Sequence, residues 1–288
     1  MIFYFFETHS APQSRLPFWI LRGISIWLHG RATATRGRVC NLLFGAFACL
    51  LFAASARSDT IPSGATTMSE PLFRPVLVQF YQELLADDDL ERFRAQVEPR
   101  YMPHTLARLL HTSDPLTRRA ALTALDLLAE TDQDDQVAEM LKDRDPLNRE
   151  LAKDVLWAIW FRADSPENSR QLKIVRALIS QGRPDEAVEL ATMLINRAPN
   201  LAEAYNQRAV ALFVGRRYIE SAADCKVAIR LKPCHFGALG GLALCQSRLG
   251  LNDEAIKTYR RALKLEPENE GIQEAIAVLE AQRASEKP

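Results

Sequence analysis

The stretch RLGLNDEAIKTYRRALKLEPEN, residues 248–269, contains the pattern that decides the fold. A turn with glycine is followed by an amphipathic helix, which carries small residues on one face and ends before Pro267. Two earlier stretches follow the same order and end at Pro199 and Pro233, so that the three prolines are 34 residues apart. A fixed period of this length is the signature of an array of helical repeats. We therefore predict an all-α fold in which successive helix pairs stack into a solenoid.

The period divides the C-terminal half into three units, at residues 168–201, 202–235 and 236–269. Twelve residues before each proline stands a small residue, which lets two helices approach closely: Ala187, Ser221 and Ala255. Gly182 and Gly250 lie between the two helices of their units, where a positive φ is expected, whereas Gly215 of the second unit lies one residue early. Apolar residues at helical spacing then predict a capping helix over 270–285.

Segments 204–233 and 248–269 resemble tetratricopeptide repeats, and segment 168–201 resembles them more loosely. The resemblance implies a right-handed α-solenoid in which the first helix of each pair lines a concave face that binds proteins or peptides. Carried over position by position, it predicts a peptide-binding groove with nine candidate residues: Leu172, Arg176, Ile179, Asn206, Val210, Phe213, Leu244, Ser247 and Arg248.

The dicarboxylate clamp known in members that bind chaperone C-termini is mostly missing. The positions that would hold its Lys, Asn and Arg are occupied by Leu172, Arg176, Gln207, Gly237 and Gly241. The predicted groove instead combines apolar side chains with two arginines, which suits an extended or helical peptide with apolar anchors and some acid.

The segment before these units also repeats, with a different period. Asp114-Pro115 and Asp145-Pro146 are 31 residues apart, and each is followed by an arginine and by Ala and Leu at helical spacing. Two such units, from about Met102 to Phe161, resemble HEAT-type repeats, and apolar residues upstream predict two more helices. We therefore expect a helical HEAT-like region at 71–164, joined near Ser165 to a tetratricopeptide domain at 165–288.

An aromatic cluster lies just before the junction of the two halves. Trp157, Trp160 and Phe161 share one helical face. Since aromatic residues dominate buried helix contacts, we predict that they pack against the first helix of the next repeat. The alternative is an exposed platform for a ligand.

The N-terminus carries a different kind of signal. Arginines precede an apolar run at 41–54, and Ala54-Ser55-Ala56 follows it, which is the order of a secretory signal peptide. We predict a targeting region at 1–56, a polar linker at 57–70 and a location in the periplasm or bacterial envelope. Alternatives are a gene start placed too early, an uncleaved anchor, which would be the chain's contact with a membrane, a lipoprotein at Cys49, and a cytoplasmic protein.

Charge and motifs bound the function further. The chain holds 36 basic and 36 acidic residues, so no basic excess points to nucleic acid. Cys225, Cys234 and Cys245, with His235, have spacings that match no zinc or haem pattern, so we interpret them as buried residues. A Cys225–Cys245 disulfide is an alternative in an oxidising compartment. The remaining histidines and aspartate runs are expected at the surface.

The sequence contains no nucleophile elbow, phosphate-binding loop or HExxH motif, so we predict no catalytic or metal-binding residues and no cofactor. The leading hypothesis is a non-enzymatic adaptor or scaffold that binds a protein or peptide partner. The alternatives are an accessory subunit of an envelope enzyme, a Cys/His metal-binding protein, and a cytoplasmic scaffold.

Overall fold

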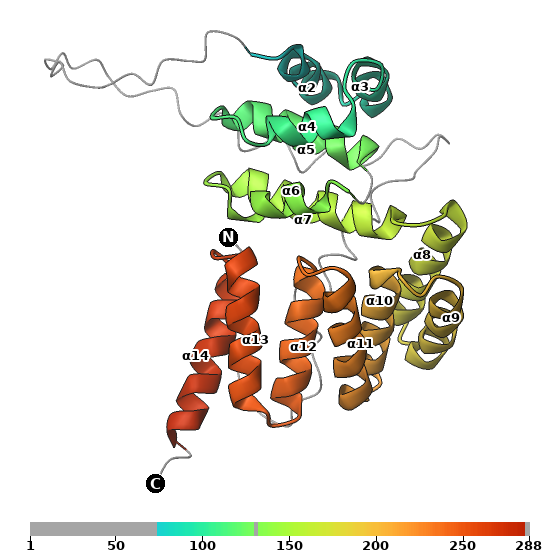
Figure 1. Ribbon diagram of the computed structural model, residues 1–288, viewed down its shortest axis with the longest axis vertical. Coiled ribbons are helices and arrows are strands. Elements are labelled where there is room, and N and C mark those ends of the chain that lie inside the picture. Colours follow the sequence, from blue (N-terminus) through green and yellow to red (C-terminus); the bar gives the residue numbers. More distant parts are fainter. Residues whose placement is uncertain (1–73, 130–131, 286–288) are drawn as a thin grey trace, which may run out of the picture. The chain divides into compact units, whose positions relative to one another are not determined.

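The computed structural model describes residues 74–129 and 132–285, which lie within one compact unit (Figure 1). The predicted targeting region and the polar linker lie outside these residues. The described part is built from α-helices, one of which is followed directly by a short 3₁₀ helix. No helix in this part of the chain is long and apolar enough to span a membrane.

The first half is a series of short helices that pack in pairs. Each helix of the 31-residue units begins with a proline or an acidic residue, a common choice for the first turn. The elements are α2 (Val76–Asp87), α3 (Leu90–Val97), α4 (Pro103–Leu109), α5 (Pro115–Leu128), α6 (Asp134–Glu139), η2 (Met140–Lys142) and α7 (Pro146–Arg162).

The 31-residue period is visible in the hydrogen bonds of these helices. Arg118 Nη1 donates to the carbonyls of Thr112 (2.9 Å) and Ser113 (3.0 Å). Thirty-one residues later, Arg149 Nη1 donates to the carbonyls of Asp143 (2.9 Å) and Arg144 (3.4 Å). Each arginine therefore closes the turn before its own helix in the same way. The repeat is real in the structure, and its assignment to the HEAT family stays a prediction.

The second half consists of three helix pairs in the predicted register. The elements are α8 (Pro166–Ser180), α9 (Pro184–Arg197), α10 (Ala202–Val214), α11 (Tyr218–Leu231), α12 (Phe236–Arg248) and α13 (Asn252–Leu265). The predicted small residues Ala187, Ser221 and Ala255 are fully buried, as close helix packing requires. At the junction, Ser165 caps α8 as predicted, because its Oγ accepts from the Asn168 amide at 3.2 Å.

The turn inside each pair has the same left-handed residue. It is Gly182 in the first unit (φ 71°) and Gly250 in the third (φ 75°), but Arg216 in the second (φ 60°). Gly215, which the sequence suggested for this role, has φ −72° and simply ends α10. Since the turns are otherwise equivalent, the second unit places a bulky residue where glycine is preferred.

The last helix, α14 (Glu270–Ser285), covers the end of the array as predicted. Leu279 is buried, and Ile272, Ala275 and Ile276 pack against α13 and the end of α12. The contact is reinforced at the surface, where Arg260 pairs with Glu280 at 2.7 Å.

Candidate functional site

Three of the nine predicted groove residues lie in the protein interior. Leu172, Ile179 and Asn206 are 1 %, 4 % and 3 % exposed. The two apolar side chains pack between α8 and the helices beside it, and Asn206 belongs to a buried hydrogen-bond network. A partner on the concave face therefore has no direct access to these three side chains.

The other six predicted residues retain exposed surface. Arg176, Val210, Phe213, Leu244 and Ser247 are half-buried and Arg248 is exposed. They come from α8, α10 and α12, the first helices of the three units. The structure thus leaves a discontinuous set of apolar and basic side chains on these helices.

Two of the six side chains are held in place by aromatic rings. The Arg176 guanidinium lies 4.3 Å from the centre of the Phe161 ring. Burial lowers the pKa of Arg176, and the nearby Glu203 carboxylate opposes that shift. The Phe213 ring packs at 5.3 Å from that of Tyr218. Arg176 therefore has a structural role, which makes it a poor residue for testing binding alone.

The positions of the dicarboxylate clamp have structural roles instead. Gln207 is buried and donates to Glu203 at 2.6 Å. A Cβ on Gly237 would lie 2.6 Å from Trp157, and one on Gly241 would lie 3.1 Å from the Cys225 sulfur. These contacts explain why side chains that could hold a carboxylate are missing there.

A buried carboxylate, Glu203, organises the end of the groove nearest α7. It lies at the start of α10 and accepts from Gln207 and, at 3.3 and 3.4 Å, from Asn206. His235 Nε2 lies 2.9 Å from Glu203 Oε2, and His235 Nδ1 accepts from the Ala238 amide. Since Nδ1 is an acceptor, Nε2 carries the proton and donates to the carboxylate. The network ties the start of α10 to the start of α12.

The aromatic cluster before the junction is packed, but its main partner is the third unit. Trp160 stacks on the His235 ring, with centroids 4.1 Å apart and 15° between planes. Trp157 meets the His235 and Phe236 rings edge-on at 5.7 and 5.3 Å. Phe161 alone packs against α8, beside Leu172. The cluster therefore joins α7 to repeats one and three, and Trp160 offers no exposed platform.

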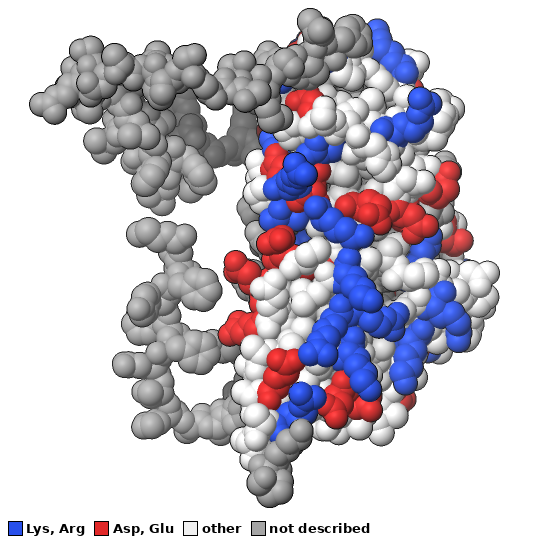
Figure 2. All heavy atoms as spheres, turned by 60° about the vertical axis from the view of Figure 1, so that its left-hand side comes forward, with Lys and Arg blue, Asp and Glu red and all other residues white. Residues whose placement is uncertain are grey.

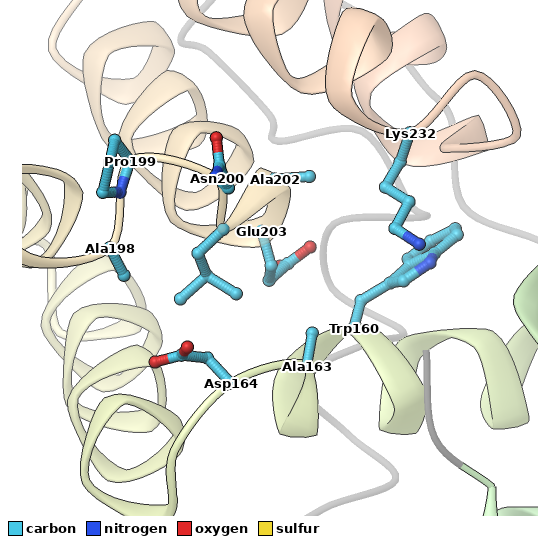
Figure 3. A pocket seen from close by; sticks show the side chains of 10 residues that line it. Trp160, Ala163, Asp164, Ala198, Pro199, Asn200, Ala202, Glu203 and Lys232 are labelled. Carbon is cyan, nitrogen blue, oxygen red and sulfur yellow. The ribbon is translucent and has the colours of Figure 1, made fainter. Parts of the chain in front are cut away.

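A pocket of about 270 Å³ lies between the end of α7 and the turns that precede α10 and α12 (Figure 3). Leu201, Ala163 and Ala198 provide apolar walls, while Asp164, Glu203 and Lys232 provide charges of both signs. Trp160 Nε1 is buried and has no hydrogen-bond acceptor among the described residues. Apolar walls and compensated charges suit a small neutral group better than an isolated ion.

The cysteines and His235 do not assemble into a common ligand set. Cys225 and Cys245 are free buried thiols that hydrogen-bond to each other, so a disulfide between them stays a prediction. Cys234 lies beside Asp134 and Asp135, with the ligand atoms of the three residues within 4.8 Å of one another.

A lysine already supplies positive charge beside this cluster. Lys232 Nζ is 2.6 Å from Asp134 Oδ2, where a metal ion would otherwise balance the carboxylates. Burial, helped by both aspartates, raises the pKa of Cys234 to about 12, so the thiol stays protonated. The acidic turn was expected at the surface, but Asp134 is buried by this pairing, whereas His104 and His111 are exposed as predicted.

Comparison with known proteins identifies the second half of the chain. Two family models, both described as tetratricopeptide repeat, match residues 172–235 and 236–269. Residues 172–269 are tetratricopeptide repeats. Their boundaries agree with the second and third units, and the first unit is covered from Leu172 onward.

Several tetratricopeptide proteins are similar over part of the chain. A TPR repeat-containing protein of Rhizobium etli is 28 % identical over 50 % of this chain and 72 % of its own length. The Hsp70-Hsp90 organizing protein of Triticum aestivum is 34 % identical over 39 % of this chain but 19 % of its own length. The first TPR domain of Spaghetti (RPAP3), solved with the HSP90 peptide SRMEEVD, is 25 % identical over 42 % of this chain and 96 % of its own, with a TM-score of 0.41.

Proposed function

We propose that this protein is a non-enzymatic adaptor that binds a protein or peptide on the face formed by α8, α10 and α12. The observation that carries the proposal is the tetratricopeptide match across these helices, together with the accessible apolar and basic side chains that they present. Arrays of this type form extended surfaces suited to binding other chains.

The residues on this face favour a particular kind of peptide. Val210, Phe213 and Leu244 provide apolar contacts, and Arg248 provides an exposed positive charge nearby. A segment with two or three apolar anchors and an acidic residue matches this set. The absence of the clamp argues against strong binding of peptides that end in EEVD, such as the one bound to RPAP3.

We also propose that the adaptor works in the bacterial envelope. This part of the proposal rests on the order of basic, apolar and small residues at 31–56. Fractionation of cells that express a C-terminally tagged chain would test it. Recovery of the tagged protein in the periplasmic or membrane fraction is expected, and recovery in the cytoplasm alone would contradict it.

The groove is tested by comparing variants in a pull-down from native cells. Phe213→Ala and Arg248→Ala are expected to reduce recovery of specific partners at least fivefold. Met193→Ala on α9 is the matched control, because this side chain is 56 % exposed on a second helix. Circular dichroism would confirm that all three variants fold. Unchanged partners in the groove variants, or equal losses in the control, would contradict the assignment.

A further inference from the structure

Five positive side chains on the second helices α11 and α13 are without a partner. Lys226 and Arg230 of α11, and Lys257, Arg261 and Lys264 of α13, are all exposed. Within the described residues, none of them forms an ion pair, a side-chain hydrogen bond or a ring contact. Lys226 and Arg230 are four residues apart, as are Lys257 and Arg261, and like charges at that spacing destabilise a helix.

Basic residues elsewhere on these repeats are compensated. Arg170 pairs with Glu167, and Arg183 with Glu186 in the first unit. Arg217 pairs with Glu220 at 2.6 Å at the start of α11. Each of these pairs joins residues three apart on the surface of one repeat. The five unpaired charges therefore depart from the pattern that the same protein uses on neighbouring turns.

The repeat places the two sets of charges on corresponding faces. Arg230 and Lys264 occupy equivalent positions 34 residues apart, and Lys226 is equivalent to Arg260. The matching positions on α9 are Thr192 and Asn196, so the basic surface is confined to the last two repeats. In Figure 2, which turns α13 and α14 toward the viewer, Lys and Arg side chains gather over the tetratricopeptide half of the molecule.

We propose that the outer faces of α11 and α13 bind an acid-rich segment of a partner protein. Charge complementarity supports this occupant, since five exposed cations lie on adjacent repeats without internal compensation. Successive charges on each helix are about 6 Å apart, close to the spacing of alternate side chains in an extended peptide.

An exposed apolar residue fits the same occupant. Ile219 is 73 % exposed and lies seven residues before Lys226, on the same side of α11. It offers an apolar contact beside the charges, which a protein segment can use and a bare polyanion cannot. The chain as a whole carries no net charge, which disfavours a nucleic acid as the occupant.

This surface is distinct from the proposed groove, which lies on the first helices. The inference does not rest on the groove, and variants in one surface should leave binding at the other unchanged. Two separate surfaces would let the protein hold two partners at once, as an adaptor requires.

The test uses a fluorescent 12-residue peptide of alternating Glu and Asp with one central Leu. Fluorescence anisotropy at 0.05 and 0.2 M NaCl would give its affinity for the full chain. Replacing the five basic residues together by Gln is expected to weaken binding at least tenfold at the lower salt. Binding to the wild-type chain should also weaken on going to the higher salt.

The matched control replaces three paired arginines by Gln, at positions 170, 183 and 217. An equal loss in this variant, or no binding of the peptide by the wild-type chain, would overturn the proposal. Vesicles with anionic phosphatidylserine and a single-stranded oligonucleotide are tested in parallel. Stronger binding to either, dependent on the five residues, would replace the protein segment as the occupant. Phe213→Ala should leave binding of the acidic peptide unchanged.

Discussion

Replacing Arg216 by glycine should stabilise the protein. Arg216 has φ 60°, and its equivalents Gly182 and Gly250 have φ 71° and 75°. The turn hydrogen bonds correspond: the Arg216 amide donates to Phe213 at 3.0 Å, and the Gly250 amide donates to Ser247 at 3.1 Å. The second unit thus makes the same turn with a residue whose Cβ disfavours it.

The size of the effect follows from two opposing terms. A residue other than glycine pays about 1–2 kcal/mol in the left-handed region. Glycine returns about 0.5–1 kcal/mol of that gain, because its unfolded chain has more conformational freedom. We therefore expect Arg216→Gly to raise the free energy of unfolding by about 0.5–1 kcal/mol and Tm by about 1–4 °C.

Two further variants make the test specific to backbone conformation. Gly250→Ala should lower stability by about 1 kcal/mol, although a Cβ there meets no atom within 4 Å. Gly215→Ala is the control, since its φ of −72° is accessible to alanine, and it should be neutral or slightly stabilising. Urea denaturation with matched m-values would measure all three. A destabilised Arg216→Gly protein, or an unaffected Gly250→Ala protein, would refute the reasoning.

Three other predictions concern the packing between repeats. Gly237→Ala should cost about 1–3 kcal/mol in urea unfolding, because its Cβ would lie 2.6 Å from the packed ring of Trp157. Arg118→Ala should cost about 3–5 kcal/mol by the same measurement, because it leaves the buried Asp143 carboxylate without its partner at 2.6 Å. Above the ordinary thiol pKa of 9.0, stability should fall as pH rises toward 12, since the unfolded chain loses the Cys234 proton first, and Cys234→Ser should flatten that slope.

Local periodicity is enough to predict the repeats. The 34-residue spacing of the prolines placed the starts of α11 and α13, and the capping helix agrees with the observed Glu270–Ser285. These features depend on residues within one or two turns of each other. The left-handed turn was shifted by one residue in the second unit, because glycine at 215 misleads a reading based on composition alone.

The accessible groove could be predicted only in part. A periodic pattern identifies a helix face, but each first helix packs against its own partner and against neighbouring repeats. Leu172 and Ile179 therefore face a core, while Val210 and Leu244 retain exposed surface.

Contacts between distant parts of the chain escaped the sequence altogether. Trp160 stacks on His235, and Asp134 pairs with Lys232, although these partners lie in different repeat arrays. Neither pairing has a local signature, because it depends on how α6 and α7 meet the turn before α12. His235 drew notice as a metal ligand candidate, but the structure uses it to cap α12 and to hold Glu203.

Site-specific photocrosslinking in the native cell tests the central claim most directly. A photoreactive phenylalanine analogue would replace Phe213 or Arg248 on the first helices, and Met193 on α9 as the control. The account predicts discrete protein adducts from the first two positions that the control position does not give. No adducts from the groove positions, or the same adducts from all three, would contradict binding on the face of α8, α10 and α12.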